Sequence, residues 1–580
     1  MANHRKGSQD LVFMMRTPIA FISLLFAASL CTNTVLAQQL PRPPHPRPQQ
    51  RPRPQEHPRL VVLCSVDQLA SWVHALGEPF YAEDGGFRRL KSAGVTFANC
   101  AFEHACTETG PGHATIGTGA PASLHGIVKN TWWDRDLKQS IYCVGEPVAA
   151  LSDLPEGGNR GPGRLLVPTL ATSMKAHIPG CKVASVSWKD RSAILMAGPD
   201  SDVAAWFEAT TGNLVTNSLW VEQTPPWMTQ FNRQRAIDSF FGKSWDRTGP
   251  VAAYEGLVDD RPWENMHYNG SLERTLPQAM TGGGTTITAP YYTQVYASPF
   301  GNTIVRMAAE AAVRGMKLGQ DAVTDLLCVS FSSTDVVGHY WGPQSVEARD
   351  ALLRLDQDLG ALFSFLDEEV GVGAWAMFLT ADHGVAPSPE ASLRNGGSGG
   401  RGPIDTWVKS SVESALRQEF GLPTSGKFYV ERVSENAVYL NRLAISAKRG
   451  AALRTAAKAC QRVHAVMTAY ATEDLRGDYN HFDPIRRALA HALSSQRAGD
   501  VQFVLQPYWL NGATPASHGS PHSYDREVVA MAIGPGIPAA TSLAAPITPG
   551  FGAVLLAKML GIPKPSAAHE NVPAGFFGLR

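Results

Sequence analysis

The first candidate for chemistry is Thr109, in the stretch 106–115, which reads CTETGPGHAT. Pro111 suits the first turn of a helix, because a residue there needs no partner for a backbone N–H. The stretch therefore predicts that a helix opens near Thr109 and that its free N–H groups favour an anion in front of the hydroxyl. A threonine hydroxyl is a weak nucleophile near neutral pH, and a metal ion or a base must activate it. We therefore look for metal ligands elsewhere in the chain.

Three apolar runs of strand length are each followed closely by acidic or imidazole side chains. The runs are 60–66, 326–331 and 375–379, and the side chains are Asp67, Asp335, His339, Asp382 and His383. Continuous apolar runs of this length are typical of strands buried on both faces, as in a parallel sheet. The carboxyl ends of such strands meet at one edge of an open α/β sheet, where ligands bind. We therefore expect these side chains to converge.

The converging set predicts a metal site. Carboxylate oxygens and neutral imidazole nitrogens suit two divalent ions, most naturally Zn²⁺. A further ligand is expected from His518 or His522, which lie between two strand-like segments near the end of the chain. Each of these residues, taken alone, is more simply explained as a helix cap, a turn residue or a buried polar group. The whole set favours the metal site.

Three polar residues outside this set could contact an anion. Asn130 offers an amide donor in the loop beyond the Thr109 helix, and Lys189 and Arg191 follow closely on the apolar run 183–187. Alone, an asparagine in a loop indicates turn chemistry, and a Lys-Asp-Arg tripeptide indicates a solvated turn. The position of the tripeptide just after a strand favours a role at the same sheet edge.

Strand-like and helix-like segments alternate along most of the chain. This alternation predicts an α/β fold with a central, mostly parallel sheet flanked by helices. Leucines recur at helical spacing in 345–366, for example, as in a helix that faces the core. From about 205 to 298 the pattern gives way to sequence rich in Trp, Pro, Gly and Asn, which predicts an insertion or cap over the core.

Composition places few limits on function. The 580 residues are 44% hydrophobic and 18% charged, enough for one large α/β domain with insertions or for two domains. The formal net charge is zero, so nothing favours a nucleic acid or an anionic membrane surface as a dedicated partner. Nothing in the sequence predicts an oligomeric state.

The first 58 residues carry export and linker signals. A basic start, an apolar run and the small-residue ending Val35-Leu36-Ala37 predict a signal peptide over 1–37, cleaved after Ala37. The apolar run is short for a stable membrane span, although an uncleaved anchor remains an alternative. Residues 38–58 are rich in Pro, Arg and Gln and predict an extended linker. We therefore expect a periplasmic or secreted protein whose catalytic domain covers 59–580.

Removal of the signal peptide leaves seven cysteines, an odd number for an oxidising compartment. Cys64 and Cys328 lie within apolar strand-like runs and are expected in the core. The disulfide candidates are Cys100, Cys106, Cys143, Cys181 and Cys460, with at least one thiol left unpaired within the chain.

These residues together resemble the alkaline phosphatase superfamily, and within it the bacterial phosphate-irrepressible type with a threonine nucleophile. The resemblance covers about 59–560. It implies two Zn²⁺ ions. It also implies a ligand set of Asp335, His339 and His518 for one ion and of Asp67, Asp382, His383 and the Thr109 oxygen for the other. Asn130, Lys189 and Arg191 are implied to bind the phosphoryl oxygens.

The function that this resemblance implies is hydrolysis of small-molecule phosphate monoesters through a phosphothreonine intermediate. Phosphodiesterases and nucleotide pyrophosphatases of the superfamily share the threonine and both metal sites, so they remain the alternative. Lys189 and Arg191 favour monoesters, because two cations suit a doubly charged phosphoryl group. A sulfatase is disfavoured, since Thr109 and His113 depart from its motif. The remaining alternative is a relative of these enzymes that binds metal ions but does not catalyse hydrolysis.

Overall fold

The computed structural model describes residues 57–264, 271–494 and 496–579. The predicted signal peptide and nearly all of the predicted linker lie outside these residues. No helix within the described ranges is long and apolar enough to cross a lipid bilayer.

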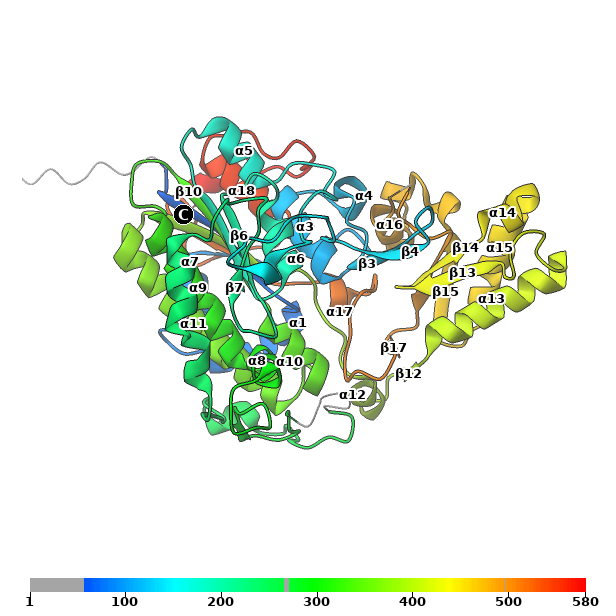
Figure 1. Cartoon of the computed structure of the whole chain (residues 1–580), viewed down its shortest axis with the longest axis horizontal. Helices are drawn as coiled ribbons and strands as arrows, with labels where there is room; N and C mark the ends of the chain where they lie inside the picture. Colours follow the sequence, from blue (N-terminus) through cyan, green and yellow to red (C-terminus); the bar gives the residue numbers. More distant parts are fainter. Residues whose placement is uncertain (1–56, 265–270, 495, 580) are drawn as a thin grey trace, which may run out of the picture. The chain divides into compact units, whose positions relative to one another are not determined.

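A nine-stranded sheet forms the centre of the fold (Figure 1). Its strands run in the order β19-β2-β18-β11-β1-β10-β5-β6-β7. The strands are β1 (Leu60–Val66), β2 (Val95–Phe97), β5 (Val183–Ser187), β6 (Val203–Phe207), β7 (Leu214–Val215), β10 (Asp325–Phe331), β11 (Trp375–Thr380), β18 (Ala530–Ile533) and β19 (Thr541–Leu543). The middle strands β11, β1, β10, β5 and β6 are all parallel, whereas β18 joins β11 antiparallel. The predicted mostly parallel sheet is therefore confirmed.

Helices cover both faces of this sheet. One group contains α2 (Gly86–Ala93), α9 (Pro299–Met316), α10 (Ser333–Trp341) and α11 (Val346–Leu366), which pack on one another, and α9 packs on β10 and β5. The other group contains α3 (Thr109–Thr118), α5 (Leu170–His177), α6 (Asp190–Ala197) and α18 (Phe551–Met559), which contact β1, β5, β6, β10 and β11. The shorter helices are α1 (Ser71–Gly77), α4 (Ala122–His125), α12 (Pro389–Arg394), α14 (Arg442–Ile445) and α17 (Ser523–Arg526).

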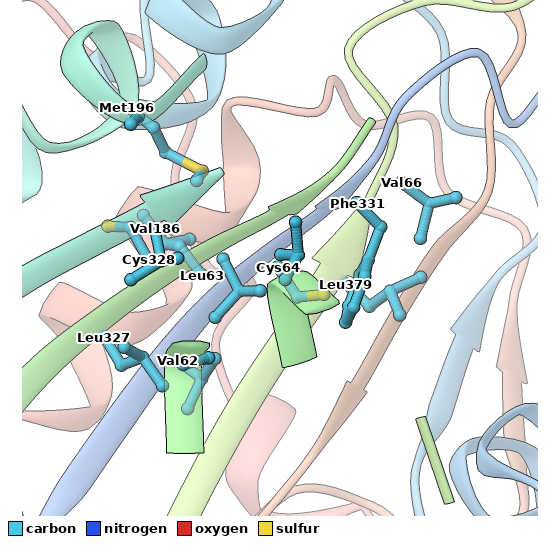
Figure 2. Close-up of a cluster of buried hydrophobic side chains, with 14 of the residues drawn as sticks. Val62, Leu63, Cys64, Val66, Val186, Met196, Leu327, Cys328, Phe331 and Leu379 are labelled. Atoms are coloured by element: carbon cyan, nitrogen blue, oxygen red, sulfur yellow. The ribbon is translucent and has the colours of Figure 1, made fainter. Parts of the chain in front are cut away.

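The sheet is buried on both faces, as the continuous apolar runs predict. Figure 2 shows side chains of β1, β10 and β5 packed with Met196 of α6. Val62 pairs across the ladder with Leu327 on one side and with Met377 on the other. Each fully buried side chain of this kind contributes about 1.5–3 kcal/mol to folding. This core fixes the strand ends from which the candidate ligands project.

A second sheet has its own hydrophobic core. It contains β13 (Val430–Ser434), β14 (Ala437–Leu440), β15 (Val466–Ala471) and β16 (Val501–Leu505), with α13 (Ile404–Phe420) and α15 (Arg449–Cys460) packed together on one side (yellow in Figure 1). The sequence analysis places strands and helices here but does not anticipate a separate sheet. Next to this sheet in the chain lies α16 (Pro484–His491).

The predicted insertion 205–298 overlaps the central sheet at its start, because Ala205 lies inside β6. Beyond β7, the segment contains α7 (Pro226–Gln234), the short pair β8 (Ser244–Trp245) and β9 (Gln278–Ala279), and α8 (Ala289–Tyr296). Two small strand pairs complete the described elements: β3 (Thr131–Asp134) with β4 (Gln139–Tyr142), and β12 (Gly400–Gly402) with β17 (Trp509–Asn511).

The disulfide prediction is wrong for the described residues. All seven cysteines are free and buried, including the five candidates Cys100, Cys106, Cys143, Cys181 and Cys460. Burial in apolar surroundings raises the pKa of the Cys106 and Cys143 thiols to about 12, which keeps them protonated and unreactive. Cys64 and Cys328 lie in the core as expected. The number of cysteines is therefore a poor guide here, because these thiols serve as small core residues.

A buried carboxyl group in α11 gives a prediction about stability. Glu347 is fully buried, and neither of its carboxylate oxygens has a hydrogen-bond partner in the part of the chain described. Burial raises the pKa of Glu347 to about 9, and the neighbouring Glu264 carboxylate adds to this rise. We expect Glu347→Leu to stabilise the fold by about 1–3 kcal/mol at pH 8.5, because an unpaired buried polar group is removed.

The stabilisation should depend on pH in a defined direction. Above pH 4.5 the unfolded chain loses the Glu347 proton, whereas the folded chain keeps it until about pH 9. Between these values the wild-type protein therefore loses stability as the pH rises, and the variant does not. Thermal melts at pH 6 and pH 8.5 should show a larger gain in Tm at the higher pH. The exposed Glu368 serves as the control (Glu368→Leu), and a lower Tm for Glu347→Leu at both values would contradict the prediction.

Candidate active site

The carboxyl ends of three adjacent parallel strands carry the candidate ligands. Asp67 follows β1 directly, Asp335 and His339 lie in α10 just after β10, and Asp382 and His383 follow β11. Because β1 pairs with both β10 and β11, these ends lie side by side. The structure thus brings together residues that are separated by more than 300 positions in the chain.

Asp335, His339 and His518 form one candidate metal group. The Oδ1 atom of Asp335 lies 3.2 Å from Nε2 of His339 and 3.6 Å from Nε2 of His518. The Nδ1 atom of His339 bonds to the carbonyl oxygen of Ala516 at 2.9 Å, and that of His518 bonds to the carbonyl oxygen of Thr107 at 2.7 Å. A carbonyl only accepts, so both Nδ1 atoms carry the proton and both Nε2 atoms are free to bind a metal ion.

Asp67, Asp382 and His383 surround a second point in the same site, and all three are fully buried. Nε2 of His383 lies 3.4 Å from Oδ1 of Asp67 and 3.5 Å from Oδ2 of Asp382. Among the described residues, none of these three atoms has a hydrogen-bond partner. Buried oxygens and an imidazole nitrogen left without partners, and directed at one another, are the donor set that fits a divalent cation. Asp67 and His383 also form a candidate metal group with Asp335.

Negative charge accumulates at this edge of the sheet. Burial raises the pKa of Asp67 well above its ordinary value, and the nearby Asp382 carboxylate raises it further. Two such carboxylates in a buried site need compensating positive charge. Lys189 supplies part of it, because its Nζ atom lies 2.6 Å from Oδ2 of Asp67 and 2.6 Å from Oδ2 of Asp335.

Thr109 lies at the start of α3, as predicted. Its hydroxyl lies close to two cationic side chains. Its Oγ1 atom is 3.4 Å from Nζ of Lys189 and 3.3 Å from Nη2 of Arg191. Lys189 precedes α6 as its N-cap residue, and Arg191 lies in the first turn of that helix. The short turn from β5 into α6 therefore places both cations at the hydroxyl.

Asn130 is held in place by a clamp that the sequence analysis missed. Oδ1 of Asn130 accepts a hydrogen bond from the backbone N–H of Gly110 at 2.7 Å. The Glu108 carboxylate accepts from the backbone N–H of Asn130 at 2.8 Å and from Nζ of Lys129 at 2.9 Å. With its oxygen engaged, Asn130 has only its amide N–H groups left to offer to a bound anion. Glu108 and Lys129 each stand next to a predicted site residue, and that adjacency is the signal that could have suggested them.

Contacts that two further residues make to the acids were also missed. Gln68 donates from Nε2 to Oδ1 of Asp335 at 2.6 Å, and its backbone N–H donates to Oδ1 of Asp382 at 3.1 Å. Nδ1 of His113 lies 3.2 Å from Oδ2 of Asp382. His113 stands four residues after Thr109, and its Nδ1 atom also bonds to the backbone carbonyl oxygen of Thr109 at 2.9 Å. His522 bonds instead to the carbonyl oxygen of Leu505, in agreement with its exclusion from the implied ligand set.

Cavities reach the site from two sides. A cavity of about 310 Å³ is lined by Lys189 and Arg191 together with the stacked rings of Trp188 and Tyr296. Another, of about 290 Å³, is lined by His339, His518 and residues of the second sheet and its flanking segments. A small phosphoester has room at either opening.

Comparison with known proteins connects this geometry to a family. The family model described as type I phosphodiesterase/nucleotide pyrophosphatase matches residues 61–525. Alkaline phosphatase PhoV of Synechococcus elongatus is 31% identical over 489 residues, which is 83% of this chain and 86% of that protein. Alkaline phosphatase PafA of Elizabethkingia meningoseptica is 30% identical over 507 residues, 84% of this chain and 89% of that protein.

The fold comparison agrees with the sequence comparison. The crystal structure of wild-type alkaline phosphatase PafA superposes with a TM-score of 0.81 at 28% identity, covering 90% of this chain and 99% of that structure. The predicted α/β architecture and the expectation of an enzyme that cleaves phosphoesters are thereby confirmed. The chain therefore belongs to the type I phosphodiesterase/nucleotide pyrophosphatase family of the alkaline phosphatase superfamily and is a phosphoester hydrolase.

Proposed function

We propose that this protein is an alkaline phosphatase that hydrolyses small-molecule phosphate monoesters through a phosphothreonine at Thr109. The observation that carries the proposal is the pair of cations at the nucleophile, with Lys189 and Arg191 both within 3.4 Å of Oγ1 of Thr109. The alkaline phosphatases PhoV and PafA, which match over most of their length, support the same reaction class.

The two cations favour a monoester because of its charge. A phosphate monoester is a dianion at alkaline pH, with three non-bridging oxygens that can accept charged hydrogen bonds. A diester is a monoanion, and an alkyl or aryl group replaces one of those acceptors. A buried ammonium and a partly buried guanidinium therefore stabilise the monoester and its transition state more strongly.

Two divalent ions, which we propose to be Zn²⁺, complete the site. Asp335, His339 and His518 would hold one ion, and Asp67, Asp382, His383 and the Thr109 oxygen would hold the other. The chemistry that such ions supply is Lewis acidity, which lowers the pKa of a nucleophile and stabilises negative charge on a leaving group. The buried, unpartnered oxygens of Asp67 and Asp382 support this assignment.

The remaining residues bind and orient the phosphoryl group. Asn130 offers its amide N–H groups from the Glu108 clamp. The free N–H groups expected at the start of α3 are not available there, because the Gly110 N–H bonds to Asn130, Pro111 has none, and the Gly112 N–H bonds to the carbonyl oxygen of Glu108. Tyr142 helps to position Arg191, since its hydroxyl accepts from Nη1 at 3.3 Å and donates to Asp190 at 2.5 Å. Lys189 and Arg191 would neutralise charge that builds up on the transferred group.

The organisation of the chain follows from this function. We propose that residues 59–580 form the catalytic domain, with 205–298 as an insertion that shapes the choice of leaving group. Residues 1–37 would direct export to the periplasm or beyond, followed by a linker over 38–58. Export suits an enzyme that acts on small phosphate esters outside the cytoplasm.

The experiment that tests the proposal compares an aryl phosphate monoester with the matched methyl aryl diester. We expect kcat/KM for the monoester to exceed that for the diester by at least about 10²-fold at alkaline pH with Zn²⁺, because two charged hydrogen bonds are each worth about 1.5–3 kcal/mol. Preference for the diester would instead assign the protein to the phosphodiesterases of the family. No metal-dependent hydrolysis of either ester would favour a relative that binds metal without turnover.

Metal removal gives a second expected outcome. Dialysis against a chelator should abolish hydrolysis, and Zn²⁺ should restore it at a stoichiometry of two ions per chain, measured by elemental analysis of the reactivated protein. Asp335→Asn and Asp382→Asn should each lower the zinc content to one ion or fewer. Asp321→Asn, a change at an exposed acid, is the control and should leave the zinc content unchanged. Full activity in protein shown to be free of metal would contradict the two-ion assignment.

A further inference from the structure

A cavity of about 940 Å³ lies outside the candidate active site and shares no residue with it. Its wall contains residues from the segment that leads into α3, from α4, from α16 and from the C-terminal segment. The titratable groups in that wall are Glu103, Arg487, His491, Arg526, His569 and Glu570, together with the Tyr479 hydroxyl. This volume is large enough for an organic metabolite.

The two arginines are fixed to the backbone and carry no ion-paired carboxylate. Nε of Arg526 donates to the carbonyl oxygen of Phe102 at 2.6 Å, and Nη1 of Arg487 donates to the carbonyl oxygen of His481 at 3.1 Å. Across the described ranges, neither guanidinium forms a salt bridge. Each arginine is therefore held by one nitrogen, with its other N–H groups free to bind a ligand. Both arginines line the same cavity, and burial together with the Arg487 charge lowers the pKa of Arg526.

The acidic groups of the cavity already have partners. Glu103 pairs with Nε2 of His569 at 3.1 Å, and Glu570 accepts a hydrogen bond from the backbone N–H of Thr548 at 3.0 Å. The Nδ1 atom of His491 is buried and has no hydrogen-bond partner within the described chain, while its Nε2 atom bonds to the carbonyl oxygen of Tyr479. Among the described residues of this wall, the cationic groups without a carboxylate partner are the two guanidiniums, which favours a ligand that carries negative charge.

We propose that this cavity is a second, non-catalytic binding site for a phosphate group, held between Arg487 and Arg526. Paired guanidinium groups suit the tetrahedral oxygens of phosphate, because each can donate two parallel N–H bonds. His491 lines the same wall, but its Nε2 atom donates to the Tyr479 carbonyl oxygen, so its unprotonated Nδ1 atom cannot donate to the anion. The phosphate group could arrive as free inorganic phosphate or as part of an organic phosphate, and the volume of the cavity leaves room for an organic body.

The test counts bound anions on the intact, zinc-loaded enzyme. Equilibrium dialysis with labelled inorganic phosphate, and separately with non-hydrolysable phenylphosphonate, gives the number of anions per chain. We expect Arg487→Gln/Arg526→Gln to bind one anion fewer than the wild type, with kcat/KM for an aryl phosphate unchanged. The criterion is the difference between wild type and variant, so it holds whether or not the catalytic site retains phosphate under these conditions.

Two further variants keep the result interpretable. Arg487→Gln alone leaves the Arg526–Phe102 bond intact, and it should weaken the second site by about tenfold or more. Arg454→Gln, a change at an exposed arginine of α15, should change neither site. Loss of phosphonate alone in the double variant identifies an organic phosphate as the ligand, and loss of both probes shows that free phosphate suffices. Equal stoichiometry in wild type and double variant for both probes, or displacement by benzoate but not by phosphate, overturns the proposal.

Discussion

Thr109→Ala is expected to lower kcat for an aryl phosphate by at least about 10³-fold, or about 4 kcal/mol of transition-state stabilisation. The variant loses the hydroxyl that Lys189 and Arg191 contact. Another hydroxyl at these cations, that of Tyr142, is already engaged with Arg191 and Asp190. The fold should survive, because alanine favours a helix and the bond from His113 reaches the backbone oxygen of residue 109 rather than its side chain. Circular dichroism and zinc content would confirm an intact scaffold.

The covalent intermediate can be observed directly. Rapid acid quench of wild type with labelled substrate should leave acid-stable phosphate on a threonine, whereas Thr109→Ala should retain none. Thr107→Ala is the matched control, since that hydroxyl bonds only to the carbonyl oxygen of Ser520 and lies two positions from the nucleophile. More than a few per cent of wild-type turnover in Thr109→Ala, or label in that variant, would rule out Thr109 as the nucleophile.

The position of the site could be predicted from the sequence, because each strand and the residue that follows it are recognisable from neighbouring positions in the chain. An uninterrupted apolar run such as 60–66 specifies a strand buried on both faces, and Asp67 at its end has to lie at the carboxyl edge of the sheet. Thr109 was identified in the same way, since Pro111 and two glycines mark the start of α3. Residues at the carboxyl ends of neighbouring parallel strands then lie near one another.

Contacts between segments that are far apart in the chain leave no comparable pattern in the sequence. The Glu108 carboxylate meets Asn130 and Lys129 across more than 20 positions, and only the folded loop brings them together. The ammonium of Lys189 between Asp67 and Asp335 is a similar case, because nothing in a Lys-Asp-Arg turn specifies which acids it will face. Gln68 was overlooked because an amide beside an acid is ordinary in a turn.

The second sheet shows a limit of periodicity. Strand β1 is buried at every position, and so are β14 and β16 of the second sheet, whereas β13 also contains partly exposed and exposed residues. The burial pattern of a single strand therefore does not predict which of the two sheets the strand joins. The cysteines are a similar case, because the sequence does not show that Cys106 is buried beside His104 and Cys143 is buried in the core, both as free thiols.

The substitution Lys189→Ala/Arg191→Ala should change specificity as well as rate. We expect the ratio of kcat/KM for an aryl monoester to that for the methyl aryl diester to fall by about 10²-fold or more. Two charged hydrogen bonds to the phosphoryl oxygens are worth about 1.5–3 kcal/mol each, and the diester uses fewer of them. Arg160→Ala is the matched control, because Arg160 lines the same cavity and binds Asp190 without contacting Thr109.

Single variants separate the two cations, which have different surroundings. Lys189 also neutralises Asp67 and Asp335, so Lys189→Ala should lower the rate for both esters and weaken discrimination. Among the described residues, Arg191 contacts Thr109 and Tyr142 but none of the proposed carboxylate or histidine ligands, so Arg191→Ala should act mainly on the monoester. An equal loss for both esters in Arg191→Ala would assign the guanidinium to the structure of the site. A diester preference that persists in the double variant would mean that the cations do not select the substrate, and the same two-metal site would then serve a phosphodiesterase.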